Sequence, residues 1–160
     1  MNEINSLIFN DLEVESDFRW LLEQRFEEPD IIGIFKKKIN FISVDFDIKN
    51  KIDLPAVSLN IFQGKSIGAD DYQMQTNTPF TVEIEVYTSG KNKNINNRKL
   101  CNIIIQLLQS NGQLPNYYCR GLYLEENREV GTLLDSAYRR IIRMSGLCDN
   151  NQKLIKRGDL

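Results

Sequence analysis

Histidine is absent from this sequence of 160 residues. Its absence removes the most common general acid–base side chain, a frequent metal ligand, and every nucleophile that depends on a Ser–His or Cys–His pair. The two glycine-rich phosphate-binding patterns, G-x-x-x-x-G-K-[ST] and G-x-G-x-x-G, are also missing. We therefore expect that the chain is not an enzyme, with no catalytic residue, no bound metal and no cofactor.

Cysteine is scarce. The three cysteines, Cys101, Cys119 and Cys148, are an odd number, and no two of them have the short spacing of a zinc site. Cys101 falls in an apolar helical pattern and Cys119 in an extended run, where a thiol packs as a small apolar side chain. We expect buried free thiols, and a disulfide framework or a metal site is the less favoured alternative.

A strong charge of either sign is also lacking, since 20 Lys and Arg residues stand against 22 Asp and Glu residues. The net charge of −2 predicts no bulk attraction to nucleic acid or to an anionic membrane. The first residues lack the basic region and apolar run of a secretion signal, and no apolar run has the length of a membrane span. We expect a chain made in the cytoplasm with no membrane partner.

The clearest positive signal is the stretch 78–90 and the segment that follows it. Every second residue is apolar, which is the period of a strand; these residues are Phe80, Val82, Ile84 and Val86. After a polar break, apolar residues recur at helical spacing from Leu100 to Leu108, and Gly112 follows as a natural stop. A strand with one apolar face and a helix with one apolar stripe predict a two-layer core.

The first 39 residues are predicted to be helical. A short amphipathic helix is expected over 4–12, and a second is expected to begin at Ser16 or Asp17 and to end at Pro29. A third short helix over 30–39 would carry three residues inward: Ile31, Ile34 and Phe35.

Four further segments are predicted to be strands, and two are polar. Alternations over 41–48 and 54–62 predict an antiparallel hairpin. The runs 117–124 and 137–145 predict two more strands, the first with Tyr118, Leu122 and Leu124 facing one way, and 125–134 reads as the break between them. The tail 147–160 is polar and is expected to be mobile.

Together these patterns predict one α+β domain over 1–160, with a core at about 40–146, an N-terminal helical segment at 1–39 and a tail at 147–160. A mostly antiparallel sheet of about four or five strands would pack on one long helix at about 96–110. The polar stretch 63–78 is long for a compact domain and is expected to be functional or mobile. Its centre suggests a protruding hairpin, and Asp70–Asp71 is a weak cation signal.

Two pairs of charged residues allow two interpretations. Glu83 and Glu85 share one strand face, and Arg139 and Arg143 share a face of the last predicted strand. A carboxylate pair on a strand is typical of nuclease and glycosidase sites. Opposite charges on neighbouring strands also form a simple ladder, worth a few tenths of a kcal/mol per pair. We favour the ladder, because a nuclease site also needs a nearby lysine and further acids in register.

Three local features carry a family resemblance. They are the strand opening Leu54-Pro55-Ala56-Val57, the strand Val82–Tyr87 with its Gly/Lys/Asn turn into an apolar helix, and the closing strand Tyr138–Gly146. Together with the order of the elements, they resemble the small tail-terminator and tail-completion proteins of tailed bacteriophages and phage-derived contractile particles. The resemblance spans roughly Asp53 to Gly146.

The resemblance implies a structural virion protein. Such subunits form a ring, commonly a hexamer, that caps the head-proximal end of the tail tube, stops its polymerisation and joins it to the neck. The implied partners are copies of itself, the tail tube protein, a neck or connector protein and a sheath protein, while genome DNA passes through without specific binding. Assembly in the host cytoplasm would place the chain in the virion tail.

The expected subunit interface includes residues of the polar stretch 63–78 and charged residues of two predicted strands. Its candidate residues are Tyr72, Gln73, Met74, Gln75, Glu83, Glu85, Arg139 and Arg143. A closed ring repeats one heterologous contact, which requires sheet edges and loops instead of a catalytic pocket. Three alternatives stay open: a head–tail connector of similar fold, a metal-dependent nuclease using Glu83, Glu85 and Asp70, and an adaptor that binds a peptide at a sheet edge.

Overall fold

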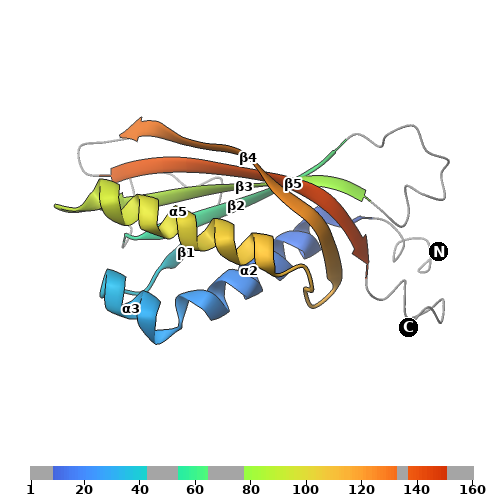
Figure 1. The fold of residues 1–160 in the computed structure, drawn as a ribbon, viewed down its shortest axis with the longest axis horizontal. Coiled ribbons are helices and arrows are strands. Elements are labelled where there is room, and N and C mark those ends of the chain that lie inside the picture. The colour runs from blue at the N-terminus through green and yellow to red at the C-terminus, as the bar shows by residue number, and fades with distance from the viewer. Residues whose placement is uncertain (1–8, 43–53, 65–77, 133–136, 151–160) are drawn as a thin grey trace.

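The computed structural model describes residues 9–42, 54–64, 78–132 and 137–150. It has an α+β fold with three helices and a mixed five-stranded sheet (Figure 1). In chain order the elements are α2 (Asp11–Phe26), α3 (Pro29–Phe35), β1 (Asn40–Ile42), β2 (Ala56–Gln63), β3 (Thr78–Ser89), α5 (Lys93–Ser110), β4 (Tyr117–Thr132) and β5 (Ala137–Asn150). The sheet order is β1-β2-β3-β5-β4.

Strand β3 is the centre of the sheet. It pairs antiparallel with β2 on one side and, along its whole length from Thr78 to Ser89, antiparallel with β5 on the other. The predicted alternation is confirmed, since the buried residues of this strand include Phe80, Val82, Ile84 and Val86. The alternation over 54–62 is confirmed in β2, where Val57, Leu59 and Ile61 are buried.

Helices α2 and α5 lie on the same face of this sheet (Figure 1), because their buried side chains join one core cluster with β2, β3 and β5. The stripe of α2 repeats at helical spacing through Val14, Phe18, Leu21, Leu22 and Phe26. The stripe of α5 consists of Asn97, Leu100, Cys101, Ile104 and Leu108. Burial of these two stripes against the sheet removes apolar surface from water and so stabilises the fold.

The predicted start of the second helix is wrong. Helix α2 begins at Asp11, and Asn10 is its N-cap, with a side-chain oxygen that accepts from the Glu13 amide at 3.2 Å. Asp17, expected as a cap, lies within the helix and is buried instead. Of the expected helix over 4–12, residues 4–8 lie outside the described part of the chain, and Leu12 belongs to the first turn of α2.

The expected hairpin over 41–62 is also wrong in direction. Strand β1 pairs parallel with β2, with Phe41 opposite Val57, and residues 43–48 lie outside the described part. An apolar alternation fixes which face of a strand is buried, but it carries no information on the direction of the neighbouring strand. In the third helix, α3, Ile31 is buried, whereas Ile34 is 42% exposed and does not face inward as predicted.

The last two strands are longer than predicted. Strand β4 continues through the expected break to Thr132, and β5 continues to Asn150, so residues 147–150 belong to the sheet and not to a tail. Residues 151–160 lie outside the described part. The predicted facing of β4 is wrong too, because Tyr117 and Cys119 are buried and Tyr118 is exposed. A register shift after Arg120 is the physical reason, since one extra residue reverses the alternation.

Candidate interaction surface on the outer sheet face

The face of the sheet turned away from α2 and α5, here called the outer face, carries the charged residues singled out in the sequence. Register places residues of neighbouring strands in rows across it. One row runs Asn60, Glu83, Arg143, Glu126, and the next runs Ser58, Glu85, Ile141, Arg128. Side chains in such rows contact their direct and diagonal neighbours.

Glu83 and Arg143 form an ion pair between β3 and β5 on this face. Nη2 of Arg143 lies 2.6 Å from Oε2 of Glu83, and Nε donates to the same oxygen at 3.2 Å. The hydrogen bond to Glu83 raises the pKa of Arg143 above its already high ordinary value. The carboxylate is therefore held by an arginine that stays charged at any physiological pH.

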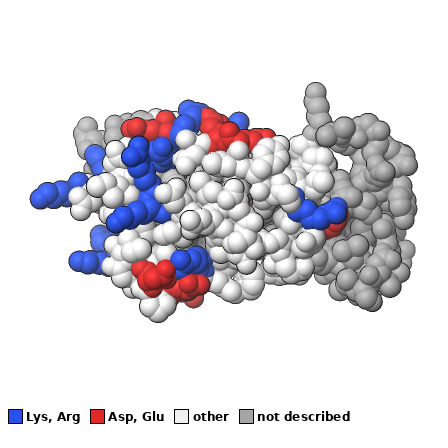
Figure 2. Space-filling view, in the orientation of Figure 1, with Lys and Arg blue, Asp and Glu red and all other residues white. Residues whose placement is uncertain are grey.

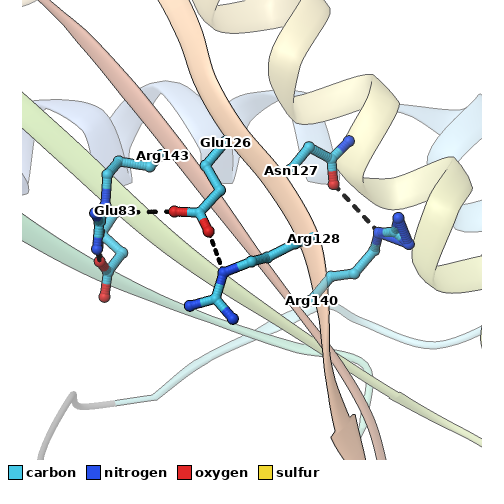
Figure 3. A network of polar contacts seen from close by, with 6 residues as sticks. All are labelled: Glu83, Glu126, Asn127, Arg128, Arg140 and Arg143. Carbon is cyan, nitrogen blue, oxygen red and sulfur yellow. Dashed lines mark hydrogen bonds and ion pairs between the residues drawn. The ribbon is translucent and has the colours of Figure 1, made fainter.

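Two residues of β4 extend this pair into a network (Figure 3). Nη1 of Arg143 lies 3.8 Å from Oε2 of Glu126, and Glu126 in turn accepts from Nε of Arg128. Asn127 and Arg140, also drawn in Figure 3, are hydrogen-bonded to each other at 3.2 Å. The network on the outer face thus alternates in charge, Glu83, Arg143, Glu126, Arg128, across three strands.

A second cluster lies beside it. Nη1 of Arg139 is 3.9 Å from Oε2 of Glu85, and the hydroxyl of Tyr87 donates to the same carboxylate oxygen. Burial, followed by this hydrogen bond to the Glu85 carboxylate, raises the pKa of Tyr87 to about 12. Tyr87 therefore stays protonated and remains a donor throughout the physiological range.

The ladder predicted from the sequence is confirmed, because Glu83 pairs with Arg143 and Glu85 with Arg139. Both carboxylates are paired with arginines. A divalent cation instead requires several oxygen ligands that are not already paired with a cationic side chain. Within the described part of the chain, no three His, Cys, Asp or Glu side chains are grouped so that they could hold a metal ion. Asp70, the third residue of the nuclease alternative, lies outside the described residues, as do Tyr72, Gln73, Met74 and Gln75.

The sequence did not single out an aromatic row on the same face. Phe62 is opposite Thr81, Thr81 is opposite Ser145, and Ser145 is opposite Tyr123. The two small hydroxyl side chains lie 2.7 Å apart between the aromatic rings. Phe62 is 45% exposed and Tyr123 is 56% exposed. Leu147, which pairs with Pro79 at this end of the outer face, is 40% exposed.

Figure 2 shows the opposite, helix-bearing side of the molecule, where charge is unevenly distributed. Lys and Arg side chains gather at the end where α5 begins, and acidic side chains lie along the two margins of the view. Helix α5 has no acidic residue in its first turn. Lys91, just before the helix, and Arg98 and Lys99, within it, are exposed. Glu125 and Glu129, on β4, are exposed as well.

Neither a scan against protein-family models nor a search of curated proteins found a match for this chain. Among residues 9–42, 54–64, 78–132 and 137–150, no helix has the length and apolarity needed to cross a membrane.

Proposed function

We propose that this chain is a structural subunit that assembles into a ring on the head-proximal end of a phage-type tail tube, ends the growth of the tube and joins it to the neck. One observation carries the proposal. The three segments that resemble tail-terminator proteins occupy neighbouring strands: Ala56–Val57 in β2, Val82–Tyr87 in β3 and Tyr138–Gly146 in β5. Segments spread along the chain thus converge on the centre of one sheet.

The paired charges support a structural role over a catalytic one. Glu83 and Glu85 lie in the β3 segment of the resemblance, and Arg139 and Arg143 lie in the β5 segment. Because these side chains form two ion pairs, the outer face presents paired charges next to exposed aromatic rings. A polar surface with a few large apolar anchors is typical of protein–protein contact.

A ring also requires two different surfaces on each subunit, because a heterologous contact joins one face of a subunit to another face of its neighbour. The basic residues near the start of α5 and the exposed Glu125 and Glu129 of β4 offer opposite charges on two different elements. Charge complementarity of this kind orients encounter and fixes register more than it adds affinity. We expect ring assembly to weaken as the salt concentration rises.

Electron microscopy of particles that lack this subunit tests the proposal. Tubes of uncontrolled length, or tails without heads, are the expected result for a terminator. Tails of normal length that lack only a layer at the neck would assign the chain to the alternative role of a connector. Normal, infectious particles would overturn both roles.

Matched variants test the outer face. We expect Tyr123→Arg and Phe62→Arg to leave the fold intact, because both side chains are about half exposed, and to abolish ring assembly on tubes. Leu12→Arg is the control, since Leu12 is 72% exposed on α2, away from the outer face. Light scattering of each variant with and without tube protein reports the assembly state, and equal behaviour of all three variants would contradict a role for this face.

A further inference from the structure

Two of the three cysteines face each other in the sheet. Cys119 of β4 is directly opposite Cys148 of β5, and their Sγ atoms are 3.7 Å apart. Both residues are nearly fully buried. Cys101, the third cysteine, lies in α5 and donates to Oδ1 of Asn97.

The backbone around Cys119 identifies the type of strand pairing at this position. The Cys119 amide donates to the carbonyl of Gly112 at 2.7 Å, which is away from β5. Because N–H and C=O of one strand residue point to the same side, Cys119 and Cys148 form a non-hydrogen-bonded pair of the antiparallel ladder. In such pairs the Cα atoms are about 4.5 Å apart and the side chains are closest. That separation is within the range of about 4.4–6.8 Å that a disulfide spans.

A hollow of about 410 Å³ opens beside the pair, between the end of α5 and the start of β4. Cys119 belongs to its lining, together with Leu108, Ser110, Gly112 and Leu122. A small oxidant in this hollow would be next to Cys119, which is itself only 4% exposed. Cys101 has no comparable position, because it is fully buried on the core side of α5.

We propose that Cys119 and Cys148 are a dithiol that a small peroxide converts, reversibly, into a cross-strand disulfide. One thiolate attacks the peroxide oxygen, which gives a sulfenic acid and one water after proton transfer. The second thiol attacks the sulfenic sulfur, forms the S–S bond and releases a second water. Two thiols and one hydrogen peroxide thus give one disulfide and two waters, and a thiol reductant reverses the reaction.

The surroundings of the pair make this reaction slow at neutral pH. The hydrogen bond with Cys119, burial and the carboxylates of Asp149 and Asp17 all raise the pKa of Cys148. Because only the thiolate reacts, the rate of oxidation is expected to increase with pH. The disulfide would fasten the start of β4 to the end of β5 and so raise the melting temperature of the oxidised chain.

Mass spectrometry of the purified full-length chain tests the proposal. After complete reduction, treatment with hydrogen peroxide and denaturing alkylation, we expect the number of reactive thiols to fall from three to one, with the loss of two hydrogen atoms from the intact mass. Peptide mapping is expected to join Cys119 to Cys148, and reductant is expected to restore all three thiols. Three thiols after oxidation, oxygen addition without a crosslink, or a disulfide that involves Cys101 would overturn the proposal.

Single substitutions provide the matched controls. Cys101→Ala is expected to form the same crosslink and to leave no free thiol. Cys148→Ser removes the partner sulfur, so no intramolecular crosslink is expected in that variant. A crosslink between two chains in the unsubstituted protein would contradict the intramolecular pairing, and this measurement does not depend on the folding of any variant.

Discussion

Asp17, within helix α2, accepts two hydrogen bonds from Asn116, which precedes strand β4. The Asn116 amide donates to Oδ2 at 2.8 Å, and its side-chain Nδ2 donates to Oδ1 at 2.8 Å. The Tyr117 amide donates to Oδ2 as well, at 3.1 Å. One buried carboxylate thus connects helix α2 to the start of β4, about 100 residues later in the chain.

Asp17→Ala is expected to lower the free energy of unfolding by about 3 kcal/mol, because it leaves the amides of Asn116 and Tyr117 without their acceptor in a buried place. Glu23→Ala on the same helix is the control. Glu23 pairs with Arg19 at the surface, so the loss of free energy of unfolding is expected to be about 0.5 kcal/mol or less. Urea denaturation measures both, and equal losses would contradict the role assigned to Asp17.

Asn97 fastens the long helix α5 to the sheet. Its fully buried side chain donates from Nδ2 to the carbonyl of Val86 at 2.9 Å and to that of Tyr138 at 3.1 Å. Asn97→Ala removes a hydrogen bond from each of two carbonyl oxygens and is expected to destabilise the fold by about 3 kcal/mol. Asn94→Ala, at an exposed position of the same helix, is expected to change stability by less than about 0.5 kcal/mol, and a comparable loss there would refute the assignment.

Substitutions on the two faces of β3 are expected to differ greatly in their effect on the stability of the fold. Val86 is fully buried, so Val86→Asp places an unpaired carboxylate in the core and is expected to prevent folding. Glu85→Gln keeps an acceptor for Tyr87 and loses only a partly exposed ion pair, so a change of about 1 kcal/mol or less is expected. Circular dichroism during thermal unfolding distinguishes them, and similar damage from both would reverse the assignment of faces.

A double-mutant cycle on Glu83 and Arg143 measures the central ion pair. We expect a coupling energy of about 1 kcal/mol from Glu83→Gln and Arg143→Met, since the contact is close but Arg143 is partly exposed. The coupling is expected to fall in about 1 M salt because exposed charges are screened. The pair Arg19–Glu23 is the surface control and is expected to couple by only about 0.3 kcal/mol.

The raised pKa of Tyr87 predicts that the free energy of unfolding decreases at alkaline pH. Its pKa is about 12 in the folded chain and about 10 in the unfolded chain, so the unfolded state releases this proton first as the pH rises. The stabilisation is complete below pH of about 10 and is lost as the pH approaches about 12, with a total of about 2 kcal/mol. Tyr87→Phe removes this dependence.

The comparison of the two proteins isolates the contribution of Tyr87. Burial also raises the pKa of Cys101 to about 12, but this thiol is present in both proteins and cancels. We expect the stability difference between the original chain and Tyr87→Phe, measured in urea at several pH values, to shrink above pH of about 10. A difference that is constant with pH would show that Tyr87 titrates normally.

Strand β3, at the centre of the sheet, was predictable because its apolar residues recur at every second position, which is the period of a strand. Strand β3 alternates without interruption from Phe80 to Val86, and its charged residues pair with the β5 arginines that the same alternation places on the outer face. Asp17 misled the prediction because a residue type that favours helix caps can also be retained inside a helix by distant amides. Asn116, which supplies one of these amides, is 99 residues away in the sequence, so the contact is seen only in the folded structure.

Glu126 and Arg128 escaped prediction for a different reason. Both lie in a polar stretch that reads as a loop, yet it forms the outer strand of the sheet, where polar residues are tolerated on the solvent side. The register shifts within β4 decide which of its side chains join the outer face, and no periodicity in the sequence reports them. The aromatic row depends on the same register, since Tyr123 follows the first shift.

Strand β4 stands at one end of the five-strand order, and its pairing with β5 is irregular at three places. An incoming extended peptide needs a long regular row of amides and carbonyls, and here the longest regular run extends only from Glu126 to Glu129 or from Tyr117 to Arg120. These interruptions discourage the addition of another extended chain along β4 and so oppose fibril growth from this edge of the sheet.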